Sequence, residues 1–258
     1  MKVSTLKKSK NKLVLLFEGT DSTYINTLRR LIMSEVPTMA IETVEFRQND
    51  SVLYDEMLAL RLGLIPLKTD LKSYCLPSEC TCEGAGCAKC QLKLTMKVEG
   101  LATVFIEELK SQDPKVVPVY PNTPLVKILD HQKIEFEATA ILGKGKEHMK
   151  WSPGLATYHG IPIITADKSA NTEIITANSK ILSIKGNVVT ILDYGKYNSA
   201  LEQELEENGF NINYSETDFI FSLESWGQLK TKEIIERAIE EYNKILTFSK
   251  NELKNKTK

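Results

Sequence analysis

The apolar positions along this chain follow two periods. Short runs that are apolar throughout or at every second residue predict strands, and apolar residues three and four apart predict helices. Strands are predicted at residues 12–18, 43–48, 91–100, 102–106, 133–142, 181–184, 188–192 and 218–224. Helices are predicted at residues 24–36, 56–64, 199–207 and 231–253. The pattern therefore predicts an α+β chain.

The two most strongly amphipathic helices lie near opposite ends of the chain. The apolar face of the first consists of Tyr24, Ile25, Leu28, Leu31, Ile32 and Val36, and Pro37 ends this helix. The stripe of the second consists of Ile235, Ala238, Ile239, Tyr242, Ile245, Leu246 and Phe248. Helices with such faces commonly pack together. We therefore expect the two ends of the chain to form one discontinuous domain, into which the middle is inserted.

The middle of the chain changes character at about residue 161. Before it, the predicted elements are mostly strands. After it, two strands flank Gly186-Asn187, which suits a tight hairpin turn, and residues 161–214 carry 4 lysines and 7 acidic residues. The predicted domains are a discontinuous one (1–43 plus 215–258), an inserted β-rich one (44–160) and a small acidic α+β one (161–214).

Composition excludes several classes of protein. The 258 residues are 42% hydrophobic and 26% charged, and 33 Lys and Arg against 34 Asp and Glu leave a net charge of -1. That balance argues against a surface devoted to nucleic acid or anionic membrane. No apolar run approaches the roughly 18–20 residues that a membrane helix needs, and the lysine-rich N-terminus does not resemble a signal peptide. We expect a cytoplasmic protein without membrane attachment.

The strongest local signal is the spacing of four cysteines, Cys80-x-Cys82-x4-Cys87-x2-Cys90. Thiolates suit tetrahedral zinc, and a Cys-x2-Cys pair can chelate one ion from a tight turn. A reduced or disulfide-bonded loop, and an iron–sulfur cluster, remain alternatives. A catalytic zinc is disfavoured because it needs an open coordination position, usually with His or carboxylate ligands, and no histidine is near. Cys75 is expected to be a spare thiol.

Catalytic motifs are missing from the sequence. It has no glycine-rich phosphate-binding fingerprint, no Walker motif and no GxSxG nucleophile elbow. None of the three histidines has a spacing typical of catalysis. We therefore predict no catalytic residue in this chain.

Three features could serve partner binding or only the fold. Arg29 and Arg30 are adjacent on a helix and point about 100° apart, either into an interface or into solvent. The basic loop 143–151 ends at a tryptophan, which fits a protein or phosphate contact, or a solvated loop with a buried Trp. The C-terminal stripe could cover its own core or a partner helix.

Four motifs, in order, resemble one known family. They are Asn-Thr-Leu-Arg-Arg-Leu-Ile-Met-Ser-Glu-Val-Pro-Thr-Met-Ala at 26–40, Asp-Glu-Met-Leu-Ala-Leu-Arg-Leu-Gly-Leu-Ile-Pro-Leu at 55–67, Asp-Pro with Val-Val-Pro at 113–118, and the Gly-Lys-Gly-Lys-Glu-His loop with Lys-Trp-Ser-Pro at 143–153. Together they resemble the α-like subunits of multisubunit RNA polymerases, and among these most nearly the archaeal D subunits. Each motif alone is modest support, whereas the ordered set is specific.

The resemblance implies a fold and a set of cofactors. Members of the family have a discontinuous dimerisation domain with an inserted β-rich domain, and many archaeal members add a ferredoxin-like domain with cluster cysteines. Residues 161–214 contain no cysteine, so a degenerate ferredoxin-like domain without an iron–sulfur cluster is expected. The eukaryotic relatives hold zinc in a similar knuckle, which would make Cys80, Cys82, Cys87 and Cys90 zinc ligands.

The resemblance also implies an assembly role without catalysis. The family subunit pairs with the small α-like subunit L, is joined by subunits N and P, and forms the platform for the large subunits B and A, so that DNA and RNA are met only through the complex. The residues implied to face the large subunits are Asn26, Arg29, Arg30, His148, Lys150 and Trp151. Those implied to face subunit L are Ile235, Ile239, Tyr242 and Leu246. The rival hypotheses are a free-standing nucleic-acid-binding protein with a zinc knuckle, and a zinc enzyme.

Overall fold

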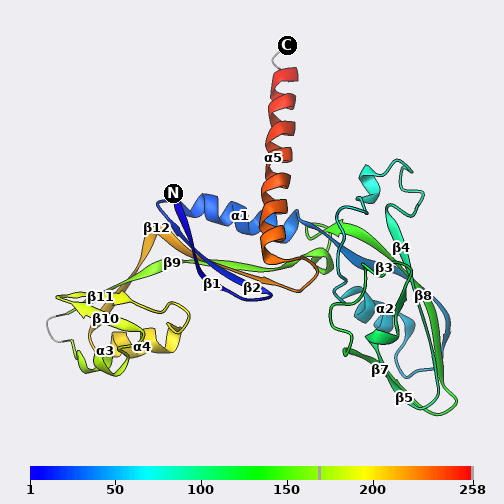
Figure 1. The fold of residues 1–258 in the computed structure, drawn as a ribbon, viewed down its shortest axis with the longest axis horizontal. Coiled ribbons are helices and arrows are strands. Elements are labelled where there is room, and N and C mark those ends of the chain that lie inside the picture. The colour runs from blue at the N-terminus through cyan, green and yellow to red at the C-terminus, as the bar shows by residue number, and fades with distance from the viewer. Residues whose placement is uncertain (168–169, 257–258) are drawn as a thin grey trace. The chain divides into compact units, whose positions relative to one another are not determined.

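The computed structural model describes residues 1–167 and 170–256 and shows a mixed helix-and-strand chain (Figure 1), as predicted. The described helices are α1 (Ser22–Ser34), α2 (Asp55–Gly63), α3 (Glu173–Ala177), α4 (Ser199–Glu207) and α5 (Thr231–Lys256). The strands are β1 (Lys2–Lys8), β2 (Lys12–Glu18), β3 (Pro37–Asn49), β4 (Gln91–Glu99), β5 (Ala102–Phe105), β6 (Lys110–Ser111), β7 (Pro124–Ile128), β8 (Lys133–Lys144), β9 (Gly154–Ala166), β10 (Leu182–Lys185), β11 (Val188–Ile191) and β12 (Phe210–Ser225). None of the described helices, α5 included, is apolar over a length that could cross a membrane.

The chain forms two compact units, and each is built from two separate segments. One contains Met1–Arg29 and Ala156–Leu223, and the other contains Arg30–Leu155 and Glu224–Lys258. The boundary between them falls inside α1. The three domains expected from the sequence divide the chain at other positions, and that division stays a prediction.

The first unit contains most of a six-stranded sheet in the order β1-β2-β12-β9-β11-β10. In β2, Leu13 and Phe17 are buried, and the Phe17 ring meets the Phe221 ring edge-on at 6.0 Å. A second apolar cluster joins β9–β12 to α3 and α4 through Ile164, Ile174, Ile175, Leu182, Val189, Ile191, Leu201, Leu205 and Phe210. Residues 161–214 therefore have an apolar core of their own.

The second unit is organised around a sheet in the order β3-β8-β4-β6. Strand β8 shows why its sequence makes a strand, because alternate residues from Ile134 to Leu142 are buried while Glu135 and Glu137 between them pair with lysines. Helix α2 buries Leu58 and Leu62, four residues apart on one face. These side chains share one core with the sheet.

The sequence pattern missed strands β1 and β9 and part of strand β12, each for a physical reason. Strand β1 is lysine-rich and mostly exposed at the end of its sheet, so it lacks an apolar face. Strand β9 contains Gly154, Gly160 and Pro162, which are unfavourable in strands. Strand β12 begins at Phe210, whereas the sequence predicted a start at residue 218. Its first half is polar and therefore shows no apolar pattern.

A half-buried lysine ties three elements of the second unit together. The Nζ atom of Lys144, at the end of β8, lies 3.2 Å from Glu35 Oε2 just after α1 and 2.7 Å from Glu241 Oε2 on α5. Glu241 is buried and also pairs with Lys244 at 2.6 Å. Burial opposes the charge of Glu241, but its hydrogen bonds to Lys144 and Lys244 outweigh this and lower its pKa. The first half of α5, up to Glu241, is therefore held in place by charge as well as by packing.

Replacing this lysine should destabilise the protein. Lys144→Met leaves two carboxylates without their shared cation, and we expect the free energy of unfolding at pH 7 to fall by about 2–3 kcal/mol in urea denaturation. Because the folded pKa of Glu241 is lowered, the stability that its charge contributes exists above the unfolded pKa of about 4.3 and is lost as pH falls through the folded pKa. The difference from the unmodified protein should therefore shrink in acid. The exposed Lys146→Met is the control, and equal stabilities at pH 7 would contradict the expectation.

Candidate functional site

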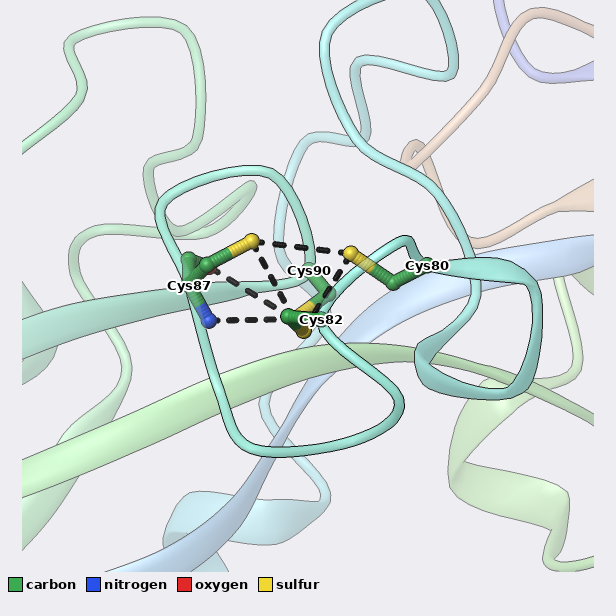
Figure 2. A group of neighbouring side chains, drawn as sticks. All are labelled: Cys80, Cys82, Cys87 and Cys90. Atoms are coloured by element: carbon green, nitrogen blue, oxygen red, sulfur yellow. Dashed lines mark hydrogen bonds between the residues drawn. The ribbon is translucent and has the colours of Figure 1, made fainter.

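Four cysteine side chains converge in the loop that precedes β4 (Figure 2). A short 3-10 turn, Pro77–Glu79, leads into Cys80, and the N–H of Glu83 donates to the Cys80 carbonyl at 3.0 Å. On the other side, the N–H groups of Cys90 and Gln91 both donate to the Cys87 carbonyl at 3.0 Å. Two tight turns thus present the thiols from opposite sides of the loop, and β4 anchors its end.

The sulfur geometry fits a tetrahedral ion. The Sγ separations are 3.4 Å for Cys80–Cys82, 3.5 Å for Cys80–Cys87 and for Cys82–Cys90, and 3.9 Å for Cys87–Cys90. A zinc ion with Zn–S bonds of about 2.3 Å holds its four sulfurs roughly 3.8 Å apart. Among the described residues, this is the group of His, Cys, Asp and Glu side chains that could hold a metal. The cluster can bind a metal ion and is compatible with zinc.

The thiols lie in unlike electrostatic surroundings. Hydrogen bonds between the Cys82 sulfur and the sulfurs of Cys80 and Cys90 lower the pKa of Cys82 to about 6. The backbone N–H of Cys87 lowers the pKa of Cys90, but burial and the neighbouring sulfurs raise it to about 12. The site therefore stabilises a thiolate at Cys82, and the thiolate is the form that binds metals. Cys75 stands outside this group, and its thiol lies 3.6 Å from the Lys89 carbonyl oxygen.

Helix α1 presents the arginines of the first motif. The N–H of Tyr24 donates to the Asp21 carboxylate at 2.8 Å, which caps the start of the helix. Further along, Nε and Nη2 of Arg29 donate to Asn26 Oδ1 at 3.1 and 2.9 Å. This pair is half-buried, whereas Arg30 is exposed. Asn26 thus orients the Arg29 guanidinium, while Arg30 points into solvent.

The loop between β8 and β9 is closely braced. His148 Nδ1 accepts from the N–H of Lys150 at 3.0 Å, and the Lys150 ammonium donates to the Ile41 carbonyl at 3.1 Å and pairs with Glu42. Trp151 is buried and donates from Nε1 to the Ile141 carbonyl at 3.4 Å. The exposed parts of the loop are therefore His148 and its neighbours, and Trp151 anchors it.

Helix α5 carries two distinct faces. Its core face contains Ile234, Ala238 and Glu241, which are buried. The partner stripe, which we define as Ile235, Ile239, Tyr242 and Leu246, begins one residue later and is rotated by about 100°. Ile235 and Tyr242 are half-buried, but Ile239 and Leu246 are 45% and 49% exposed. The stripe therefore lies outside the core of this chain.

One surface was missed by the sequence reasoning. Leu64 at the end of α2, Met149, and the turn that contains Trp226 and Gln228 line a cavity of about 290 Å³. The clue in the sequence was α2 itself, where Met57, Leu60 and Leu64 add apolar residues outside the buried pair. Its other components come from distant segments that only the fold brings together.

The chain is similar to known proteins over most of its length. Residues 14–246 match the family model described as the RNA polymerase Rpb3/Rpb11 dimerisation domain. The chain is 35% identical to the DNA-directed RNA polymerase subunit Rpo3 of Methanosphaera stadtmanae over 91% of its own length and 92% of that protein. It is 35% identical to the Methanosarcina acetivorans subunit Rpo3, with 91% of each chain covered. The match to the Pyrobaculum aerophilum subunit Rpo3 is 37% and covers 81% of this chain and 79% of that one.

These matches extend over nearly the whole chain, through both compact units and across the cysteine loop. The chain belongs to the RNA polymerase Rpb3/Rpb11 dimerisation domain family and, within it, to the archaeal D subunits, the DNA-directed RNA polymerase subunits Rpo3.

Proposed function

We propose that this chain is a non-catalytic assembly subunit of an archaeal DNA-directed RNA polymerase and acts in the cytoplasm. It pairs with the small α-like subunit L, and the pair, joined by subunits N and P, forms the platform for the large subunits B and A. DNA and RNA are then contacted through the complex. Near-full-length identity to subunits Rpo3 supports this role and does not favour a free-standing nucleic-acid-binding protein.

The observation that carries the proposal is the partner stripe of α5. Ile239 and Leu246 are large apolar side chains on a helix whose core face is already occupied by Ile234 and Ala238. Their 4-3-4 spacing with Ile235 and Tyr242 is the period of a seam between two helices. A family model named for dimerisation covers this stripe. The occupant of the stripe is therefore a helix of subunit L, in an obligate interface that typically buries 2,000 Å² or more.

The finer architecture follows from the same proposal. The dimerisation domain comprises residues 1–43 and 215–258, the β-rich domain 44–160, and a degenerate ferredoxin-like domain 161–214 without an iron–sulfur cluster. Zinc is the ion that we assign to Cys80, Cys82, Cys87 and Cys90, on the basis of the sulfur separations. When bound, it would hold the loop shut as a structural ion.

The proposal is tested by asking which proteins accompany the chain. A tagged full-length chain, expressed in its own cells and purified gently, should bring down the small α-like subunit and the large subunits together, as identified by mass spectrometry. Expressed alone, the chain should self-associate, because the partner stripe is exposed. A stable monomer with no affinity for the small subunit would refute the assembly role.

The arginine surface gives a separate prediction. We assign two groups of residues to contacts with the large subunits: Asn26, Arg29 and Arg30 on α1, and His148 and Lys150 in the loop that Trp151 anchors. Arg30→Ala should leave the pair with the small subunit intact but weaken capture of a large subunit, roughly tenfold for a charged interface contact. A two-step pull-down separates the effects. Lys232→Ala, an exposed cation on α5, is the control. Equal capture by Arg30→Ala would remove Arg30 from the interface.

A further inference from the structure

A hollow of about 560 Å³ lies in the first unit, against the six-stranded sheet. In β12, Ile220 and Ser222 line it, while Phe221 between them points to the opposite face of the sheet and is buried there. Strand β2 adds Val14 to the lining, and residues 192–196, which follow β11, complete it. The hollow therefore has the sheet as its floor and a loop as its wall.

A bulge in β1 turns two neighbouring side chains into this hollow. The pairing with β2 shifts by one residue between Thr5 and Lys7, so Leu6 is an extra residue without a partner in β2. Consecutive side chains of a regular strand point to opposite faces, yet Leu6 and Lys7 both line the hollow. The bulge thus presents an apolar group and a cation side by side.

The hairpin of β1 and β2 (Figure 1) ends in a basic tip, which we define as Lys7, Lys8, Lys10 and Lys12. The tip has four lysines within six residues and no acidic residue. Lys7, Lys8 and Lys10 are exposed, and none of the three forms an ion pair with a described residue. The turn itself is closed, because the N–H of Ser9 donates to the Lys12 carbonyl at 2.8 Å. Exposed cations on a closed turn attract an anionic partner.

The carboxylate in the lining of the hollow is engaged within its own loop. Asp193 accepts from the N–H of Gly195 at 3.0 Å and pairs with the Lys196 ammonium at 3.4 Å. The Asp193 carbonyl also accepts from the N–H groups of Lys196 at 3.2 Å and Tyr197 at 3.3 Å. Asp193 therefore shapes the wall, and the lysines of the basic tip remain for a ligand.

The lining indicates the class of this ligand. Leu6 and Leu192 are 37% and 57% exposed, and together with Val14 they make one side of the hollow apolar. Single-stranded nucleic acid is normally held by aromatic rings that stack on its bases, but apart from Tyr194 and His159 the apolar lining is aliphatic. A small amphiphile carries a single charge, whereas the basic tip presents several. An acidic polypeptide segment with an apolar side chain fits both the lysines and the hollow.

We propose that the basic tip and the hollow form one binding site for an acidic polypeptide segment of a partner protein. Its carboxylates pair with the lysines of the tip, and its apolar side chain enters between Leu6, Val14 and Leu192. Charge complementarity and the apolar side of the hollow support this occupant. The site goes beyond the assembly role and does not depend on it, because its residues lie in the first unit and the partner stripe lies in the second.

The probe is a short, fluorescently labelled peptide of glutamates around a central leucine, and fluorescence anisotropy measures its affinity for the full-length chain. It should bind roughly tenfold more tightly than the same peptide with a central serine, which cannot fill the hollow. Lys7→Glu should weaken binding at least about tenfold and make it less sensitive to salt. Leu192→Ser should weaken binding about fivefold and leave the salt dependence unchanged.

Two controls match these variants. Lys185→Glu makes the same change of charge at an exposed position of β10, the strand at the other edge of the same sheet. Val188→Ser removes an apolar side chain of similar exposure to Leu192, 54% against 57%, from a position outside the lining. Both should bind the leucine peptide within about twofold of the unmodified chain.

Several results would overturn the proposal. They are the absence of measurable peptide binding, equal binding of the leucine and serine peptides, or binding by Lys7→Glu or Leu192→Ser as tight as by the unmodified chain. Tighter binding of single-stranded oligo-thymidine that is lost in Lys7→Glu would assign the site to nucleic acid. Self-association that Lys7→Glu abolishes, without peptide binding, would assign the tip to acidic residues of a second copy. None of these results bears on the assembly role, which is decided by the proteins that accompany the chain.

Discussion

A chain that carries Ile239→Asp and Leu246→Asp should fold but fail to pair with the small α-like subunit. Each change places a carboxylate on the partner stripe, where an apolar seam would bury it without a counter-ion. Central interface side chains commonly contribute 2 kcal/mol or more each, so we expect affinity to fall by at least about a thousandfold. Co-expression with the small subunit, followed by size-exclusion chromatography, measures the loss.

The matched control for this experiment lies two residues further on. Phe248 is 67% exposed, more than either stripe residue, and is rotated about 200° from Leu246 around the helix. Phe248→Asp should therefore leave pairing intact. The double variant should keep its helices, because both residues lie outside the core. Circular dichroism checks this. Pairing that survives the double variant would place the dimer interface elsewhere.

The two faces of α5 show how far a periodic pattern can be interpreted. The sequence marked its length and its apolar character, and the helix runs from Thr231 as predicted. It could not separate Ala238, which is buried, from Ile239 beside it, which is exposed. Both are apolar, and only the position of the sheet decides which of them faces the core. Local pattern thus predicts the helix, whereas the free face depends on tertiary packing.

The candidate sites also differ in whether local sequence or tertiary packing brings their residues together. The cysteine cluster was predictable because its four cysteines lie within eleven residues, so that two tight turns suffice to gather them. The cavity beside Leu64 was not predictable, since its lining comes from segments as far apart as Leu64 and Trp226. The sequence analysis missed strand β1 for a third reason: its lysines conceal a strand that is stabilised by pairing with β2, from Lys2 opposite Glu18 to Lys8 opposite Leu13, with one irregularity between Thr5 and Lys7.

Removing the metal ligands gives the second large effect. We expect the purified chain to contain about one equivalent of zinc, and Cys80→Ser with Cys90→Ser to contain less than about a tenth, because two thiolates cannot complete a closed tetrahedral site. Amide exchange in residues 75–91 should then quicken on the order of a hundredfold, since the ion closes the loop. The core strand β8 should keep its protection, because its buried side chains belong to an apolar core made mostly of residues outside the loop, to which Leu76 adds a partly buried side chain.

Cys75→Ser is the matched control for the metal experiment, because Cys75 lies in the same loop but outside the cluster. It should keep its zinc and its slow exchange. Unmodified protein with less than about a tenth of an equivalent, purified without chelator and under reducing conditions, would show that the loop is held by its turns alone. The outcome bears on assembly too, because the loop leads directly into β4 of the four-stranded sheet in the second unit. If pairing with the small subunit survives metal loss while large-subunit capture weakens, the zinc loop supports the platform face rather than the dimer seam.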